Sequence, residues 1–126
     1  MGMLVKDIMT TQVLTIQETA SLKEVIQLLV EIDISGLVVV NAAEEVVGVI
    51  TGKDVLVAFD YLQQIKAPIK DYVSDGVISV SEESTVEEVS RILVQNNILR
   101  VPVLRDKKLV GIVSRRDVLR HIYKTN

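Results

Sequence analysis

Two short stretches of the chain carry the same three kinds of polar group: a hydroxyl, a basic side chain and a carboxylate. The residues are Thr51, Lys53, Asp54, Ser114, Arg116 and Asp117. A carboxylate accepts hydrogen bonds through two oxygens, so it suits a vicinal diol that donates two. The hydroxyl and the free amides at a helix start suit an anion, and a neighbouring cation adds charge-assisted bonds to phosphate. A diol together with a phosphate indicates a ribonucleotide.

The same spacing is also that of a helix capping box, in which a hydroxyl residue and an acid three positions later satisfy each other's amides. The expected helices of this chain begin with the pattern at Ser21, Thr51, Thr85 and Ser114. The acid is a glutamate after Ser21 and Thr85 but an aspartate after Thr51 and Ser114. Because the shorter aspartate is expected to close the box less well, we expect both aspartates to point outward. Plain capping is the alternative interpretation.

The two motifs belong to a tandem repeat. Residues 5–40 align with residues 69–104 without a gap, and the motifs realign after one extra residue in the first copy. That extra residue falls in a stretch with the composition of a turn. Two repeats are too few for a solenoid, so we expect them to pair and share a core. The predicted domains are unit 1 over residues 1–66, including an N-terminal leader, and unit 2 over residues 67–126.

Each copy is predicted to fold as strand, helix, strand, strand, helix. In the first copy, residues 13–16 form a short strand and Ser21 opens an amphipathic helix. Residues 37–40 and 46–50 are continuous apolar runs, which predict buried strands joined by a tight turn. A second helix follows from about Asp54. The predicted fold class is therefore α/β (α+β), with two pseudo-symmetric β-α-β-β-α units.

Composition narrows the function classes. The 126 residues are 48% hydrophobic and carry a net charge of −3, which favours a folded protein and argues against non-specific nucleic-acid binding. No apolar run reaches the roughly 18 residues that a membrane span requires. With no cysteine and a single histidine, His121, we expect no metal site. No base stands beside Ser114 or Thr51 to activate it, so we expect no catalysis. The absence of cysteine and of a signal peptide favours the cytoplasm.

The repeated motifs, GVITGKDV and GIVSRRDV, together with the second-copy phrase LRVPVL, resemble the CBS domain, the regulatory module named for cystathionine β-synthase. The resemblance extends from Val5 to about Tyr123. It implies that the two units pack through their sheets and that clefts at their interface bind AMP, ADP, ATP or S-adenosylmethionine. It further implies that the motif aspartate holds the ribose hydroxyls, that the Thr or Ser contacts ribose or phosphate, and that backbone groups of the second strand of each unit read adenine.

Carried over by position, the resemblance assigns a stronger and a weaker cleft. The second copy supplies the motif residues, an adenine edge and a cation facing phosphate; these residues are Arg100, Val101, Pro102, Ser114, Arg116 and Asp117. The first copy keeps Thr51, Lys53 and Asp54 but has Gly36 in place of Arg100 and Val38 in place of Pro102. We therefore expect the second cleft to be the stronger.

The predicted function is a non-enzymatic sensor of adenine nucleotides that regulates an unknown effector protein, with no other cofactor. The resemblance also implies a homodimer formed through the helices. One alternative is a ligand-free structural or interaction module in which the aspartates are only helix caps. Others are an S-adenosylmethionine binder and a nucleic-acid binder that uses the basic residues of the last quarter of the chain.

Overall fold

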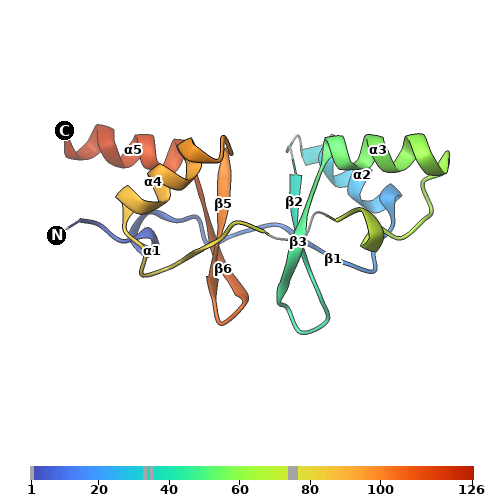
Figure 1. The fold of residues 1–126 in the computed structure, drawn as a ribbon, viewed down its shortest axis with the longest axis horizontal. Coiled ribbons are helices and arrows are strands. Elements are labelled where there is room, and N and C mark those ends of the chain that lie inside the picture. The colour runs from blue at the N-terminus through green and yellow to red at the C-terminus, as the bar shows by residue number, and fades with distance from the viewer. Residues whose placement is uncertain (1, 33, 35, 74–76) are drawn as a thin grey trace. The chain divides into compact units, whose positions relative to one another are not determined.

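The structure is a computed structural model that describes residues 2–32, 34, 36–73 and 77–126. The chain divides into two compact units (Figure 1). The central unit comprises Leu14–Val77, and the terminal unit comprises Met1–Val13 together with Ile78–Asn126. In the part of the chain that is described, no helix has the length and apolar character needed to cross a membrane.

The central unit is a three-stranded sheet with helices on one side of it (Figure 1). Its elements are β1 (Thr15–Gln17), α2 (Leu22–Ile32), β2 (Gly36–Val40), β3 (Val46–Thr51), α3 (Gly52–Leu62) and the short 3-10 helix η1 (Lys70–Tyr72). The strand order is β1-β2-β3, with β1 parallel and β3 antiparallel to β2.

The terminal unit repeats this plan. Its elements are α1 (Val5–Ile8), β4 (Val80–Ser81), α4 (Val86–Gln95), β5 (Arg100–Arg105), β6 (Lys108–Ser114) and α5 (Arg115–Thr125). The strand order is β4-β5-β6, again with one parallel and one antiparallel pair. The doubled α/β fold is therefore confirmed, whereas the packing of the two units through their sheets still rests on the family resemblance.

Two element boundaries differ from the prediction. The strand expected at residues 13–16 is Thr15–Gln17, and the helix expected from about Asp54 begins at Gly52. The helix starts earlier because the Thr51 side chain accepts a hydrogen bond from the Asp54 amide, which makes Thr51 the N-cap. Each motif therefore runs from the end of a strand directly into a helix.

Each compact unit includes a short segment that the sequence alignment assigns to the other repeat. The predicted boundary between residues 66 and 67 does not show this arrangement. The leader (residues 2–13) places Val5, which is fully buried, in the core of the terminal unit. Its repeat counterpart Ile69, also fully buried, lies in the core of the central unit. The Val5 amide donates to the Ser84 carbonyl at 2.8 Å, and the Ile69 amide donates to the Ala20 carbonyl at 2.9 Å. Each compact unit is therefore completed by the first residues of the other repeat.

The leader also pairs with the edge of the second sheet. The Thr10 amide donates to the Ile112 carbonyl and the Ile112 amide donates to the Thr10 carbonyl, both at 2.9 Å. Gly111 makes this approach possible, because an added methyl group would lie 2.6 Å from the Met9 sulfur. The leader is thus joined to β6 shortly before the second motif.

Candidate functional site

The residues predicted for the second site come together at one end of β5 and β6. In the sheet register Arg100 lies opposite Ser114, Val101 opposite Val113 and Pro102 opposite Ile112. The helix α5 begins immediately after Ser114, which brings Arg116 and Asp117 to the same end of the sheet. The side chains of Arg100 and Arg116 are exposed, whereas Val101 and Pro102 are buried. The sequence therefore places both cations and the acid in one neighbourhood.

The main chain of Val101 and Pro102 lies beyond the paired length of β4. That strand pairs with β5 at Val103 and Leu104. A proline fits here because it has no amide N–H to contribute to a neighbouring strand. The segment that the resemblance assigns to adenine thus lies past the end of one neighbouring strand.

The first motif lies in the same sheet register as the second, but a glycine occupies the position of Arg100. Gly36 lies opposite Thr51, as Arg100 lies opposite Ser114, and Lys53 is exposed. A methyl group added to Gly36 would lie 3.1 Å from the Ile50 carbonyl oxygen, so the backbone is closely approached at this position. The first repeat therefore brings a hydroxyl, a lysine and a carboxylate to its sheet end, but no counterpart of Arg100.

The expectation that the motif aspartates turn away from their helix caps is wrong. Asp117 Oδ2 accepts from the Ser114 amide at 2.9 Å and from the Ser114 hydroxyl at 3.0 Å. Asp54 Oδ2 accepts from the Thr51 amide at 2.8 Å and from the Thr51 hydroxyl at 2.9 Å. Both residues close a capping box, and each does so with one carboxylate oxygen.

The two glutamates differ from each other. Glu24 closes its box with longer bonds: it accepts from the Ser21 amide at 3.2 Å, and its own amide donates to the Ser21 hydroxyl at 3.2 Å. Thr85 accepts from the Glu88 amide at 3.1 Å, but no return bond from Glu88 occurs among the described contacts. The short aspartate side chain brings a single oxygen within reach of both the N-cap amide and the N-cap hydroxyl. The expectation that an aspartate closes the capping box less well than a glutamate is therefore wrong.

Capping leaves the other aspartate oxygen available. Asp117 Oδ1 receives only the Arg120 guanidinium, at 3.4 Å, among the described residues, and the Asp117 side chain is 8% exposed. Within the same part of the chain, Asp54 Oδ1 receives no protein donor, and Asp54 is half-buried. Capping and ligand recognition are therefore compatible, because they use different oxygens of the same carboxylate.

Two arginines of this site were not found from the sequence. The Arg115 side chain donates to the Ile98 carbonyl at 2.9 Å, and its amide donates to the Leu99 carbonyl at 2.9 Å. These bonds fix the segment that leads into β5. Arg120 lies three residues after Asp117, a helical spacing that predicts contact. That spacing is the signal that could have identified Arg120.

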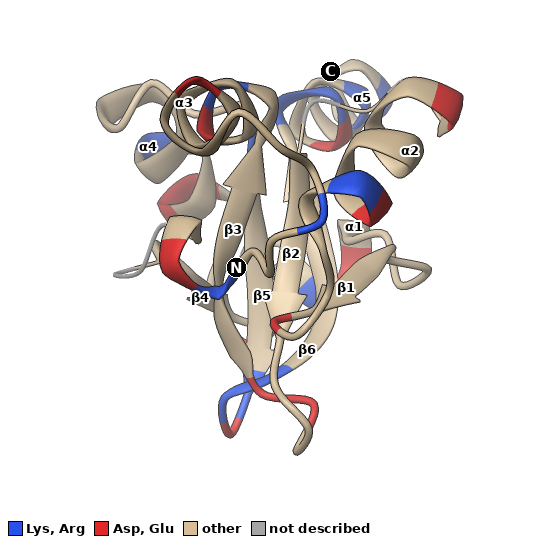
Figure 2. Ribbon diagram, turned by 90° about the vertical axis from the view of Figure 1, so that its right-hand side faces the viewer, with Lys and Arg blue, Asp and Glu red and all other residues tan. Residues whose placement is uncertain are grey.

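The charge around the two motifs differs. The helix α5 contains Arg115, Arg116, Arg120 and Lys124, whereas α3 contains one lysine and two aspartates (Figure 2). Arg115 and Arg116 are the first two residues of α5, and cations at a helix start favour an anionic ligand. The second motif therefore has the more favourable electrostatics for phosphate. Among the described residues, no three His, Cys, Asp or Glu side chains gather as a metal site would require.

Comparisons with known proteins agree with this arrangement. The sequence model of the CBS domain matches residues 5–61 and 69–124. The uncharacterized protein MJ1225 of Methanocaldococcus jannaschii is 30% identical over 117 residues, which cover 92% of this chain and 41% of that relative. The chain thus spans less than half the length of this relative.

Two solved structures share the fold over nearly the whole chain. The crystal structure of CBSX2 in complex with AMP has 27% identity and a TM-score of 0.87, and the match covers 98% of each chain. The CBS domain pair of MJ0100, in complex with 5′-methylthioadenosine and S-adenosyl-L-methionine, has 28% identity and a TM-score of 0.81 over 100% of each chain. Since both repeats match the same family model, the chain belongs to the CBS domain family as a tandem pair.

Proposed function

We propose that this chain binds an adenine nucleotide, AMP, ADP or ATP, and uses the bound ligand to regulate a partner protein. The observation that carries the proposal is that the two oxygens of each motif aspartate differ: Oδ2 caps the helix, and Oδ1 is not used by the cap and can accept from a ligand. The adenosine compounds bound by CBSX2 and by the MJ0100 domain pair support the same ligand class.

The second motif offers the fuller set of contacts. Asp117 Oδ1 suits the ribose diol, while Arg100 and Arg116 suit the phosphates. Ser114 donates its hydroxyl proton to Asp117 and accepts from the Asp117 amide. Because this hydroxyl is held in the capping box and the carboxylate that it contacts is only a weak base, a binding role is favoured over nucleophilic catalysis.

Asp117→Asn separates capping from recognition. The asparagine oxygen can still accept from the Ser114 amide, which keeps the box. Its NH₂ group then replaces Oδ1 and cannot accept from a diol. The variant loses a negative charge at the start of a helix, so it should be destabilised by about 0.3–1 kcal/mol. We expect AMP to raise the melting temperature of the parent by mass action and to lose most of this effect in the variant.

Asp54→Asn makes the same test in the first repeat, and Glu88→Gln is the matched control. Glu88 is also an acid at the third position of a helix, but it makes no bond back to its N-cap among the described contacts. Glu88→Gln should therefore leave AMP binding unchanged. Calorimetry with AMP, ADP, ATP and S-adenosylmethionine identifies the ligand. If the parent binds none of them, the chain is a structural module and the proposal fails. If both Asn variants bind as the parent does, the motif aspartates do not recognise the ligand and the observation that carries the proposal is overturned.

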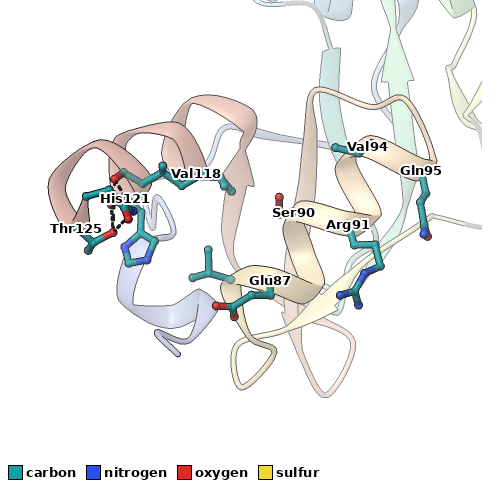
Figure 3. Close-up of a pocket in the computed structure, with 11 residues that line it drawn as sticks. Glu87, Ser90, Arg91, Val94, Gln95, Val118, His121 and Thr125 are labelled. Carbon is teal, nitrogen blue, oxygen red and sulfur yellow. Dashed lines mark hydrogen bonds between the residues drawn. The ribbon is translucent and has the colours of Figure 1, made fainter. Parts of the chain in front are cut away.

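We also propose that a second copy of the chain covers the helices of the terminal unit. A groove of about 570 Å³ lies between α4 and α5 (Figure 3). Val94 and His121 are among the residues that line it, and Val94 is 74% exposed. On the same helices Leu119 is 64% and Tyr123 is 86% exposed. Exposed apolar side chains on the same two helices favour burial in an interface.

A further inference from the structure

The two motif aspartates differ in what contacts their second oxygen. In the terminal unit, Arg120 donates to Asp117 Oδ1 at 3.4 Å. The residue three positions after Asp54 is Val57, which is 58% exposed and has no charge or donor. The two repeats therefore present the same carboxylate with a different neighbour one helical turn away.

The number of acceptor positions makes this difference matter. An ionised carboxylate accepts about four hydrogen bonds, roughly two at each oxygen. In both repeats Oδ2 already accepts from the N-cap amide and the N-cap hydroxyl. The two positions of Oδ1 are open in Asp54, whereas Arg120 occupies one of them in Asp117. A vicinal diol donates two hydrogen bonds, so only the first repeat can accept both without displacing a protein group.

We propose that Arg120 is a specificity-determining residue that competes with one ribose hydroxyl for Asp117 Oδ1. It thereby lowers the preference of the second repeat for a ribose over a deoxyribose. This inference rests on the proposed function, since it concerns the same site. The contact is long, and the Arg120 side chain is 51% exposed, so a ligand can displace it at small cost. The expected effect is about two- to fivefold, the range of exposed ion pairs.

The test compares AMP with 2′-deoxy-AMP, which lacks one of the two hydroxyls. Calorimetry gives the dissociation constant of each ligand for Asp54→Asn and for Asp54→Asn with Arg120→Val, so that only the second site retains its acid. The attraction between Arg120 and the phosphate is equal for both ligands and cancels in their ratio. We expect the preference for AMP over 2′-deoxy-AMP to rise about two- to fivefold when Arg120 is removed.

The reciprocal change uses the first repeat. Val57→Arg in an Asp117→Asn background should lower the preference for AMP by a similar factor, because it supplies the competing donor. The comparison is decided in whichever repeat binds AMP measurably. If that repeat binds AMP but the ratio of the dissociation constants for 2′-deoxy-AMP and AMP does not change with the substitution, the role of Arg120 is overturned and the proposed function stands. Where ADP or ATP is the nucleotide that the chain binds, that nucleotide and its 2′-deoxy form replace the AMP pair. Failure of the unmodified chain to bind any of the three nucleotides overturns both proposals.

Discussion

Replacing Gly111 with alanine tests how closely the leader packs on β6. Gly111 is buried, and the added methyl group would lie 2.6 Å from the Met9 sulfur and 3.0 Å from the Thr10 carbonyl oxygen. The Met9 side chain can move aside. The Thr10 carbonyl is main chain and accepts from the Ile112 amide at 2.9 Å, so relief of the second contact requires the leader to shift.

The cost follows from these contacts. Overpacking of a buried position costs about 1–3 kcal/mol, and opening the reciprocal pair between Thr10 and Ile112 adds about 1 kcal/mol for each hydrogen bond lost. We expect Gly111→Ala to lower the free energy of unfolding by roughly 1–5 kcal/mol, with the upper end reached if both hydrogen bonds open. Urea denaturation measures this loss. Hydrogen exchange should also show faster exchange at the amides of Thr10 and Ile112, because the leader is loosened before the rest of the unit.

Gly52→Ala is the matched control, because an added methyl group there meets no atom within 4 Å. It should be neutral or stabilising by up to about 1 kcal/mol. Combining Met9→Ala with Gly111→Ala should recover part of the loss, since it removes the closest contact. A Gly111→Ala protein that is as stable as the parent, with unchanged exchange at Thr10, would refute the packing described for the leader.

Three further predictions concern the terminal unit. Val5→Ala should cost roughly 2 kcal/mol in urea denaturation, because Val5 is fully buried; an unchanged midpoint would contradict this. The Arg105 side chain hydrogen-bonds Glu82 and holds the pKa of Glu82 below its usual value, so the pair stabilises the fold above about pH 4 and loses this effect as pH falls through the lowered pKa. Thermal melts of Arg105→Gln and the parent should therefore differ at pH 7 and converge at low pH; a constant difference would argue against the pair. Leu119→Asp should convert a dimer into a monomer in light scattering, and a parent that is already monomeric would remove the basis for the helix interface.

Much of this fold can be predicted from the sequence because the chain repeats itself. The alignment of Gly36 with Arg100 correctly predicted that these residues occupy equivalent register positions, opposite Thr51 and Ser114. Continuous apolar runs located the paired strands, since a buried strand needs such a run on both faces. Local patterns therefore located the residues of the candidate site.

The exchanged segments and the closed capping boxes could not be predicted in the same way. Periodicity within a segment does not say which distant surface the segment will cover, so the burial of Val5 beside the second repeat was not foreseen. Its alignment with the apolar Ile69 was the available signal. The aspartate boxes depend on whether one oxygen reaches two donors at once, which is a matter of local geometry rather than residue type.

The division of the chain into units has a mechanical consequence. The central unit is an insertion: the polypeptide enters it between Val13 and Leu14 and leaves it between Val77 and Ile78. The central unit is therefore joined to the terminal unit by two backbone connections, whereas a unit at a chain end has one. The first of these connections is continuous with the leader that pairs with β6. A displacement begun at the first motif has a covalent route to the edge of the sheet that carries the second.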